Sequence, residues 1–427
     1  MGTQLPGQEK LSDGISLYIH IPFCKSKCPY CDFNTYQGIE ALMGSYLEAL
    51  ALEIGLWGRT LGHPRVNTIF FGGGTPSYLT IEHLAQVFHA ARNAFNVSPD
   101  AEITLEANPD DLNLEKLKGM LGLGANRLSI GVQSLDDSLL SLLGRRHTAE
   151  DAMDAFRLAR QAGFNRVNLD LMYGLPCQTM AQWESTLERM LELGPPHLSI
   201  YCLTLEEGTP LEWWVRQGRL PEPDPDLAAD MYTRAEERLE VAGYHHYEIS
   251  NWAMPGFQCL HNMAYWLNQP YLGVGPGAHS CLHGHRFWDV DPPRLYIQRV
   301  QGWASQPVPS TGSGQALSRV EGDVGPVGKL DRDALLRLGP VGGVETIEPR
   351  LEMAETMFLG LRLLDGLSIE DFKRRFAQDP MQLYGPQIQE LTEQGLLEHS
   401  ALKDQSVLRL TRKGCLLANQ VFMRFLE

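Results

Sequence analysis

The sequence has 427 residues, of which 43% are hydrophobic and 21% are charged, a composition that excludes a disordered or fibrous protein. It contains 36 Lys and Arg residues against 52 Asp and Glu residues, so the formal net charge is -16 at pH 7. An acidic surface of this size repels phosphate backbones and anionic lipids, which excludes nucleic acid as a general partner. A chain of this length can form one large domain and a smaller one.

Residues 1–15 are expected to form an N-terminal tail. They lack an apolar segment behind a basic end, and no other segment approaches the roughly 18 apolar residues that a membrane helix needs. The sequence therefore predicts a cytoplasmic protein with no integral membrane segment.

Six short apolar runs bounded by Gly, Pro or Asn predict β-strands, and the segments between them have helical periodicity. The runs are Leu17 to Ile21, Val66 to Phe71, Glu102 to Leu105, Arg127 to Val132, Arg166 to Leu171 and His197 to Leu203. The expected helices include Ala41 to Leu56, Ile81 to Phe95 after the N-cap candidate Thr80, and Ala149 to Ala162 before Gly163. This alternation predicts an α/β fold of six βα units over residues 16–240, with a parallel sheet whose nearly continuous apolar strands are covered on both faces.

Unusual residues follow five of these strands at their carboxyl ends. CKSKCPYC follows the first strand, GGGTPS the second, Glu106 the third, Gln133 and Ser134 the fourth, and Asp170 with YGLP the fifth. Ligands and catalytic groups collect at this edge of parallel α/β sheets and barrels. We therefore expect the five segments to converge on one site.

The second half divides into three parts. Residues 241–300, dense in aromatics, His and Gly, are expected to extend the barrel with irregular structure and short strands. Residues 301–345 contain nine Gly and four Pro, which predicts a linker or insertion. Residues 346–427 predict a helical, winged-helix-like domain with a β pair near Leu396 to Leu410, but 10 Lys and Arg against 13 Asp and Glu between 345 and 427 disfavour DNA binding.

Three of the eight cysteines lie in one loop, at the spacing C-x3-C-x2-C. These are Cys24, Cys28 and Cys31, whereas five others stand alone and are expected to be ordinary buried thiols: Cys177, Cys202, Cys259, Cys281 and Cys415. Zinc held by the three thiolates and His20 is one interpretation. A 4Fe-4S cluster is the favoured one, since three cysteines leave one iron open to a substrate or cofactor.

These motifs resemble the radical S-adenosylmethionine (SAM) superfamily, which implies a partial (βα)6 radical SAM barrel. LYIHIPFCKSKCPYC, FFGGGTPSYL, LEANPDDL, GVQS, LGRRH and NLDLMYGLP resemble the oxygen-independent coproporphyrinogen III oxidase group across nearly the whole chain. The similarity is greatest to the heme-chaperone branch of that group, HemW.

The resemblance implies a role for each matching residue. Cys24, Cys28 and Cys31 would bind the cluster, and the SAM contacts would be Tyr18, Tyr30, Gly73, Gly74, Thr75, Glu106, Gln133, Arg145 and Asp170. Glu106 would accept hydrogen bonds from ribose hydroxyls. Three alternatives stay open: Tyr18 as a packed strand residue, Glu106 as an ion-paired structural residue, and Arg146 in place of Arg145.

The branch depends on departures from the oxidase pattern. Phe33 stands where the oxidase has a fourth cysteine, and the chain reaches Cys24 without the oxidase's longer N-terminal arm. HNMAYW, from His261 to Trp266, matches a motif of the chaperone branch, and His261 could ligate heme iron, with His245, His246 and His279 as competitors.

The chaperone interpretation implies heme, a heme-acceptor protein and an electron donor as partners. An oxygen-independent coproporphyrinogen III oxidase is the alternative, and a radical SAM enzyme with another substrate is a third. Phe33 counts against oxidase activity and HNMAYW against an unrelated substrate.

Overall fold

The computed structural model describes residue 11 and residues 13–305, 330–402 and 405–426. Its main sheet has twelve strands, and the six expected strands lie at its centre in chain order, each parallel to the next. They are β1 (Ile15–Ile21), β2 (Arg65–Gly73), β3 (Asn96–Ala107), β4 (Arg127–Gln133), β5 (Arg166–Tyr173) and β6 (His197–Cys202). The predicted parallel sheet is confirmed.

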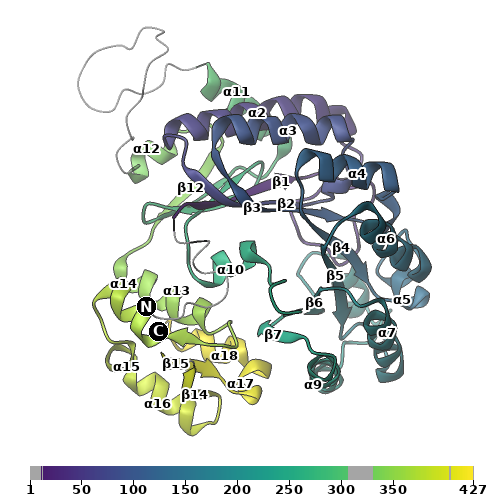
Figure 1. The fold of residues 1–427 in the computed structure, drawn as a ribbon, viewed down its shortest axis with the longest axis vertical. Helices are drawn as coiled ribbons and strands as arrows, with labels where there is room; N and C mark the ends of the chain where they lie inside the picture. The colour runs from purple at the N-terminus through teal and green to yellow at the C-terminus, as the bar shows by residue number, and fades with distance from the viewer. Residues whose placement is uncertain (1–10, 12, 306–329, 403–404, 427) are drawn as a thin grey trace.

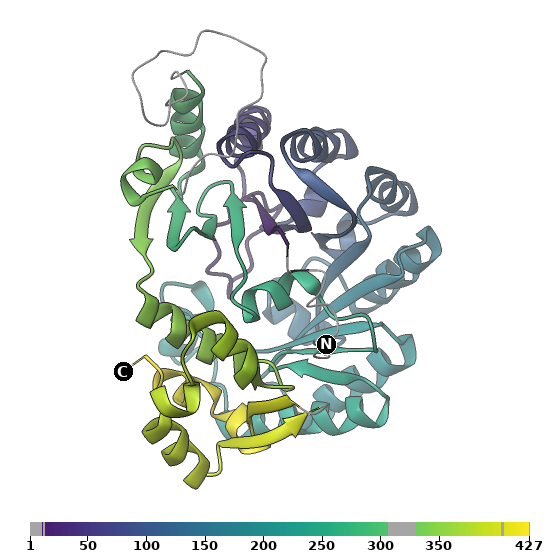
Figure 2. The ribbon, with the colours of Figure 1, turned by 60° about the vertical axis from the view of Figure 1, so that its left-hand side comes forward.

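Helices cover the outer, convex face of the curved sheet (Figures 1 and 2). Thr80 caps α3 by accepting a hydrogen bond from the His83 amide at 3.3 Å, and Gly163 ends α6 with a φ of 116°, so both predicted boundaries are confirmed. The helices of this layer are α2 (Met43–Thr60), α3 (Ile81–Ala94), α4 (Leu114–Leu123), α5 (Asp137–Leu142), α6 (Ala149–Ala162), α7 (Met180–Leu193) and α9 (Pro225–Val241). Helix α8 (Pro210–Arg216) contacts the cysteine loop, where the Leu211 amide donates to the Pro29 carbonyl at 2.9 Å, and 3-10 turns lie at Glu40–Leu42, Pro76–Tyr78 and Pro109–Asp111.

The two faces of the central strands differ in polarity. On β4, Leu128, Ile130 and Val132 are completely buried beneath the helices, whereas Arg127 and Ser129 line a cavity on the inner side of the sheet. The expectation of nearly continuous apolar strands is therefore wrong for the inner face. Side chains alternate along a strand, so the polar positions i and i+2 collect on the concave surface.

Both edges of the sheet are extended by later parts of the chain. Strand β9 (Tyr271–Val274) pairs in parallel with β1, and β10 (His279–Leu282), β11 (His285–Asp289) and β12 (Val341–Thr346) follow it as antiparallel strands. At the other edge, β8 (Asn251–Ala253) and β7 (His245–Glu248) continue from β6. The segment expected to be irregular also contains the helix α10 (Leu260–Trp266), which carries HNMAYW.

The segment expected to be a linker is partly regular. Helix α11 (Pro293–Ala304) enters it, and α12 (Arg332–Leu336) and β12 follow within it. Because β12 pairs with β11, this part of the chain belongs to the main sheet. Residues 306–329 of the same segment lie outside the described residues.

The C-terminal residues form a smaller domain of helices around a three-stranded antiparallel sheet, seen in yellow-green below the main sheet in Figure 1. It consists of α13 (Pro349–Gly360), β13 (Leu367–Ser368), α14 (Ile369–Phe376), α15 (Pro380–Leu383), α16 (Gly385–Glu393), β14 (Leu397–Leu402), β15 (Gln405–Leu410), α17 (Arg412–Leu416) and α18 (Ala418–Met423). Arg362 bonds the buried carboxylate of Glu248 at 3.4 Å, and the Ile249 amide donates to the Arg362 carbonyl at 3.3 Å. The predicted α/β fold with a smaller C-terminal domain is confirmed.

In the part of the chain that the structure describes, no helix combines the length and the apolar composition that a bilayer span requires.

Candidate functional site

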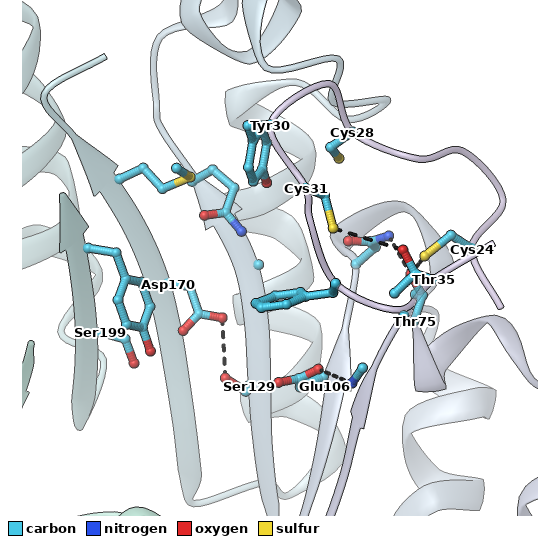
Figure 3. A pocket seen from close by; sticks show the side chains of 18 of the residues that line it. Cys24, Cys28, Tyr30, Cys31, Thr35, Thr75, Glu106, Ser129, Asp170 and Ser199 are labelled. Carbon is cyan, nitrogen blue, oxygen red and sulfur yellow. Dashed lines mark hydrogen bonds between the residues drawn. The ribbon is translucent and has the colours of Figure 1, made fainter. Parts of the chain in front are cut away.

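A cavity of about 600 Å³ opens at the carboxyl ends of the central strands. Residues from five strands and from the cysteine loop line it, and Figure 3 shows the labelled cysteines, Glu106 and Asp170 around the same space. The expected convergence of separate segments on one site is therefore present in the fold.

The cysteine loop follows β1 and returns to it. The Cys24 amide donates to the Tyr36 carbonyl at 2.9 Å, and the Tyr36 amide donates to the Pro22 carbonyl at 2.8 Å, which closes the loop. The Cys31 amide donates to the Cys28 carbonyl at 3.2 Å, so the second and third cysteines share a tight turn. All three thiols line the cavity, and burial raises the pKa of the Cys24 and Cys31 thiols.

The glycine turn after β2 packs directly against this loop. Gly73 has a φ of 106°, and a Cβ there would collide with the His20 ring. A Cβ on Gly74 would lie 2.7 Å from the carbonyls of Ile21 and Phe23 and 3.1 Å from the Cys24 sulfur. Thr75 follows and donates its hydroxyl to that sulfur at 3.5 Å. The glycines thus let the turn approach the cysteine loop, and Gly73, Gly74 and Thr75 all line the cavity.

Glu106 lies near the end of β3 and borders the cavity. Its carboxylate accepts a hydrogen bond from the Gly73 amide at 3.2 Å. Burial and the charge of Asp170 raise the pKa of Glu106 to about 8. No ion pair to Glu106 occurs among the described residues, so the ion-paired alternative has no partner there.

Asp170 faces Glu106 from β5 and has its own hydrogen bonds. Its carboxylate accepts from the Asn168 amide nitrogen at 2.7 Å and from the Ser129 hydroxyl at 3.3 Å. Burial raises the pKa of Asp170, and its hydrogen bonds oppose that rise. A buried carboxylate held by neutral donors keeps acceptor capacity for a ligand.

Gln133 ends β4 in a left-handed conformation that is unusual for a residue other than Gly. Its φ is 70°, and the pairing of β4 with β5 shifts register between Gly131 and Gln133. Such strain persists where the surrounding structure enforces it, often at a binding site. The bulge directs the strand end at the cavity, which Gln133 lines.

Arg145 and Arg146 have different surroundings. Arg145 points into the cavity region, where its guanidinium lies 3.6 Å from the Cys28 sulfur, 2.6 Å from the Asn108 side-chain oxygen and 2.7 Å from the Gly131 carbonyl. Arg146 forms ion pairs with Asp110 and Asp111 instead. Of the two candidates, Arg145 is the one that lines the cavity, together with Tyr30.

Tyr18 lies outside the main cavity. It lines a second cavity of about 390 Å³, together with His20, Phe33, Asn34, Gly73, Glu106, Tyr265, Tyr271, Gly277 and His279. Its hydroxyl bonds His20 Nδ1 at 3.0 Å, and His20 Nε2 bonds the Asn34 carbonyl at 2.9 Å. Both ring nitrogens of His20 are therefore engaged, which removes the fourth ligand of the zinc interpretation.

His261 is a buried histidine with both ring nitrogens engaged. Nδ1 bonds the Thr68 hydroxyl at 2.8 Å, Nε2 bonds the Tyr265 hydroxyl at 3.0 Å, and the ring stacks on Phe70. Burial lowers the pKa of His261 to about 3, so the ring is neutral. In this conformation His261 offers no free nitrogen to a heme iron.

The solitary cysteines are less uniform than expected. Cys259 and Cys415 are buried and Cys281 is partly buried, but Cys177 and Cys202 are exposed, so the prediction of buried thiols is wrong for these two. Cys202 ends β6 and lines the main cavity. Cys202 is exposed because it is the last residue of β6, at the edge of the sheet where the cavity opens.

Several lining residues are absent from the sequence-based set. They are inward-facing polar or charged residues, among them Arg127, Ser129, Asn168 and Ser199, with Asn108 and Asn262 from loops or α10. Arg127 is only 2% exposed and places a cation inside the barrel. The sequence carries a signal for them, because most alternate positions of β4, β5 and β6, beginning at Arg127, Arg166 and His197, hold polar residues.

The arrangement of the cysteine thiols distinguishes a zinc site from a 4Fe-4S cluster site. Among the residues that the structure describes, no three His, Cys, Asp or Glu side chains are arranged to hold one metal ion. Zinc requires its ligands around a single ion. A 4Fe-4S cluster takes each thiolate on a different iron, so three thiols spread along a cavity wall fit the cluster.

Two protein-family models match separate parts of the chain. The model of the radical SAM superfamily matches residues 18–190, and the model of the HemN C-terminal domain matches residues 347–417. Over its full length the chain resembles the structure of coproporphyrinogen III oxidase (HemN) from Escherichia coli, with a TM-score of 0.78 at 22% identity, covering 100% of this chain and 93% of that one. At this identity the likeness concerns the fold.

Two curated relatives align over most of the chain. The heme chaperone HemW of Bacillus subtilis is 37% identical over 413 residues, which is 96% of this chain and 99% of the relative. Radical S-adenosyl methionine domain-containing protein 1, mitochondrial, of Bos taurus is 35% identical over 99% of this chain and 88% of the relative. The resemblance inferred from the motifs is confirmed: the chain belongs to the HemW family of radical SAM proteins.

Proposed function

We propose that this protein is a heme chaperone that binds heme and passes it to an acceptor protein, and that it carries a 4Fe-4S cluster with SAM. The observation that carries the proposal is the meeting of three thiols from one loop with Glu106, Gln133 and Asp170 around one cavity, in a chain of the HemW family. Coproporphyrinogen oxidation is the competing function, and Phe33 stands where that activity calls for a fourth cysteine.

Cys24, Cys28 and Cys31 are the proposed cluster ligands. When bound, a reduced cluster supplies the electron that radical SAM chemistry requires, and an electron donor must restore it. Thr75 donates to the Cys24 sulfur at 3.5 Å, and Arg145 lies 3.6 Å from the Cys28 sulfur. The Thr75 hydrogen bond opposes the rise that burial causes in the pKa of the Cys24 thiol.

The proposed SAM contacts are those that border the main cavity. Glu106 would hold the ribose hydroxyls, Gly73, Gly74 and Thr75 would border the ligand with backbone groups, and Gln133, Arg145, Asp170 and Tyr30 would complete the set. Arg127 adds a buried cation that suits a carboxylate. Tyr18 lines the second cavity. It would contact SAM at the boundary where Glu106 and Gly73 border both cavities.

Heme titration tests the function. The full chain is reconstituted anaerobically with iron and sulfide, titrated with heme while the Soret band is recorded, and then mixed with apomyoglobin as a probe acceptor. The proposal expects saturable binding followed by transfer, and absence of heme binding by the reconstituted protein would overturn it.

A further inference from the structure

The second cavity lies beside the main one and shares a wall with it. Phe33, Gly73 and Glu106 border both cavities. The rest of its lining is largely aromatic, with Tyr18 from β1, Tyr265 from α10 and Tyr271 from β9. A flat, largely apolar ligand matches such walls.

Phe33 is the most exposed large hydrophobic side chain at this boundary. It is 65% exposed, although it belongs to the cysteine loop, whose two ends are tied together beside β1. The Lys27 ammonium donates a hydrogen bond to the Phe33 carbonyl at 3.1 Å. This bond holds the Phe33 backbone and leaves its ring exposed. The Phe33 ring borders both cavities and is free to pack against a ligand.

Two histidines line the second cavity, and their ring nitrogens differ in availability. Both nitrogens of His20 are hydrogen-bonded, as described above. His279, at the start of β10, is exposed, and neither of its ring nitrogens has a hydrogen-bond partner among the described residues. His279 can therefore coordinate a metal without breaking an existing bond.

The surroundings of His279 orient its ring and keep it neutral. The ring stacks on Trp288, with centroids 5.6 Å apart and an interplanar angle of 24°. Burial and the Arg286 cation lower the pKa of His279, against the opposing charge of Asp291. A neutral imidazole has the lone pair that iron ligation needs.

The other candidate histidines are less suitable. His245 is on β7, at the opposite edge of the sheet from β10, and lies 3.6 Å from the Asp365 carboxylate. His246 contacts the Glu236 carboxylate and stacks on Trp252. The nitrogens of His261 are engaged by Thr68 and Tyr265.

We propose that His279 is the axial ligand of the heme iron and that the macrocycle lies in the second cavity against Phe33. This inference rests on the proposed heme binding and adds its location and ligand. It places heme next to the main cavity, where Phe33 of the cysteine loop and Glu106 of β3 border both cavities.

The test compares His279→Ala with the matched control His245→Ala in the reconstituted full chain. Iron and sulfide content and far-UV circular dichroism establish that each variant is folded and loaded. The inference expects His279→Ala to weaken heme binding at least tenfold and to shift the Soret band, while His245→Ala keeps the affinity and spectrum of the wild type.

A second variant guards against an indirect effect. In His279→Gly, free imidazole should restore the wild-type spectrum by taking the vacated place at the iron. Heme binding by His279→Ala with unchanged affinity and spectrum would overturn the ligand assignment and leave the proposed function intact. A wild-type protein that binds no heme would overturn both.

Discussion

The guanidinium of Arg145 lies 3.6 Å from the sulfur of Cys28, although the two residues come from distant parts of the chain. Arg145 also donates to Asn108 at 2.6 Å and to the Gly131 carbonyl at 2.7 Å. It therefore connects the cysteine loop to the ends of β3 and β4. This position makes Arg145 a structural support of the site as well as a proposed SAM contact.

Arg145→Met should destabilise the protein. The substitution leaves two partly buried oxygens, on Asn108 and Gly131, without their donor, and each lost hydrogen bond should cost about 0.5–1.5 kcal/mol in the free energy of unfolding. Arg146→Met is the matched control, because its ion pairs with Asp110 and Asp111 are partly exposed and contribute about 0–1 kcal/mol. Urea denaturation measures both, and equal losses in the two variants would contradict the assigned role of Arg145.

Cys28→Ala should abolish cluster assembly. Two thiolates of one loop cannot retain a cluster that three are proposed to hold, so iron and acid-labile sulfide should fall to background after reconstitution. Cys202→Ala removes a thiol that lines the same cavity outside the loop and should retain both. Undiminished iron and sulfide in Cys28→Ala would exclude that cysteine as a ligand.

Glu106 should make stability depend on pH. Its pKa is raised from 4.5 to about 8, so between these values the folded state holds a proton that the unfolded chain has lost. The free energy of unfolding should therefore fall as pH rises through this window, by up to about 1.4 kcal/mol per pH unit.

The variant Glu106→Gln isolates this contribution. The free energy of unfolding of both proteins is measured by urea denaturation without SAM. Between pH 4.5 and about pH 8 the wild type should lose stability relative to the variant as the pH rises. A difference that stays constant with pH would show that Glu106 titrates normally.

His261→Ala should cost stability and leave the heme spectrum in place. The ring is buried, hydrogen-bonded at both nitrogens and stacked on Phe70, so its removal should cost about 2–5 kcal/mol. Thermal unfolding measures the loss, and the Soret position of the heme-loaded variant measures the ligand. Loss of the wild-type spectrum in this variant alone, with His279→Ala unchanged, would assign the ligand to His261.

The pH dependence of His261 has the opposite sign to that of Glu106. Burial lowers its pKa from 6.5 to about 3. Between these two pH values His261 is protonated in the unfolded chain and neutral in the folded protein. The contribution of His261 to stability is therefore complete above about pH 6.5 and is lost as pH falls toward 3. The difference between wild type and His261→Ala should shrink over that acidic range.

Local signals in the sequence predicted the fold well. Thr80 and Gly163 mark helix boundaries through bonds within a few residues, and β-branched runs mark the strands. The site was predicted where the chain carries rare local patterns, as at the cysteine loop and the glycine turn. Helix α10 was missed because its seven residues are too short to show a helical period.

Contacts between distant segments could not be predicted. The hydrogen bond between Thr68 and His261 joins β2 to α10, 193 residues further along the chain. The placement of Phe33 and His279 on one cavity depends on how β1, β9 and β10 pair. Arg127 stands in the sequence at the start of an apolar run, and a single strand does not reveal which of its faces is enclosed. Three-dimensional pairing supplied this information.

The central claim, that the protein handles heme as a chaperone, is tested most directly by measuring heme binding and coproporphyrinogen decarboxylation on one reconstituted, reduced, SAM-containing sample. The account predicts a saturable Soret change and no decarboxylated product above the control without protein. Decarboxylated product in excess of that control, with no heme bound, would contradict it.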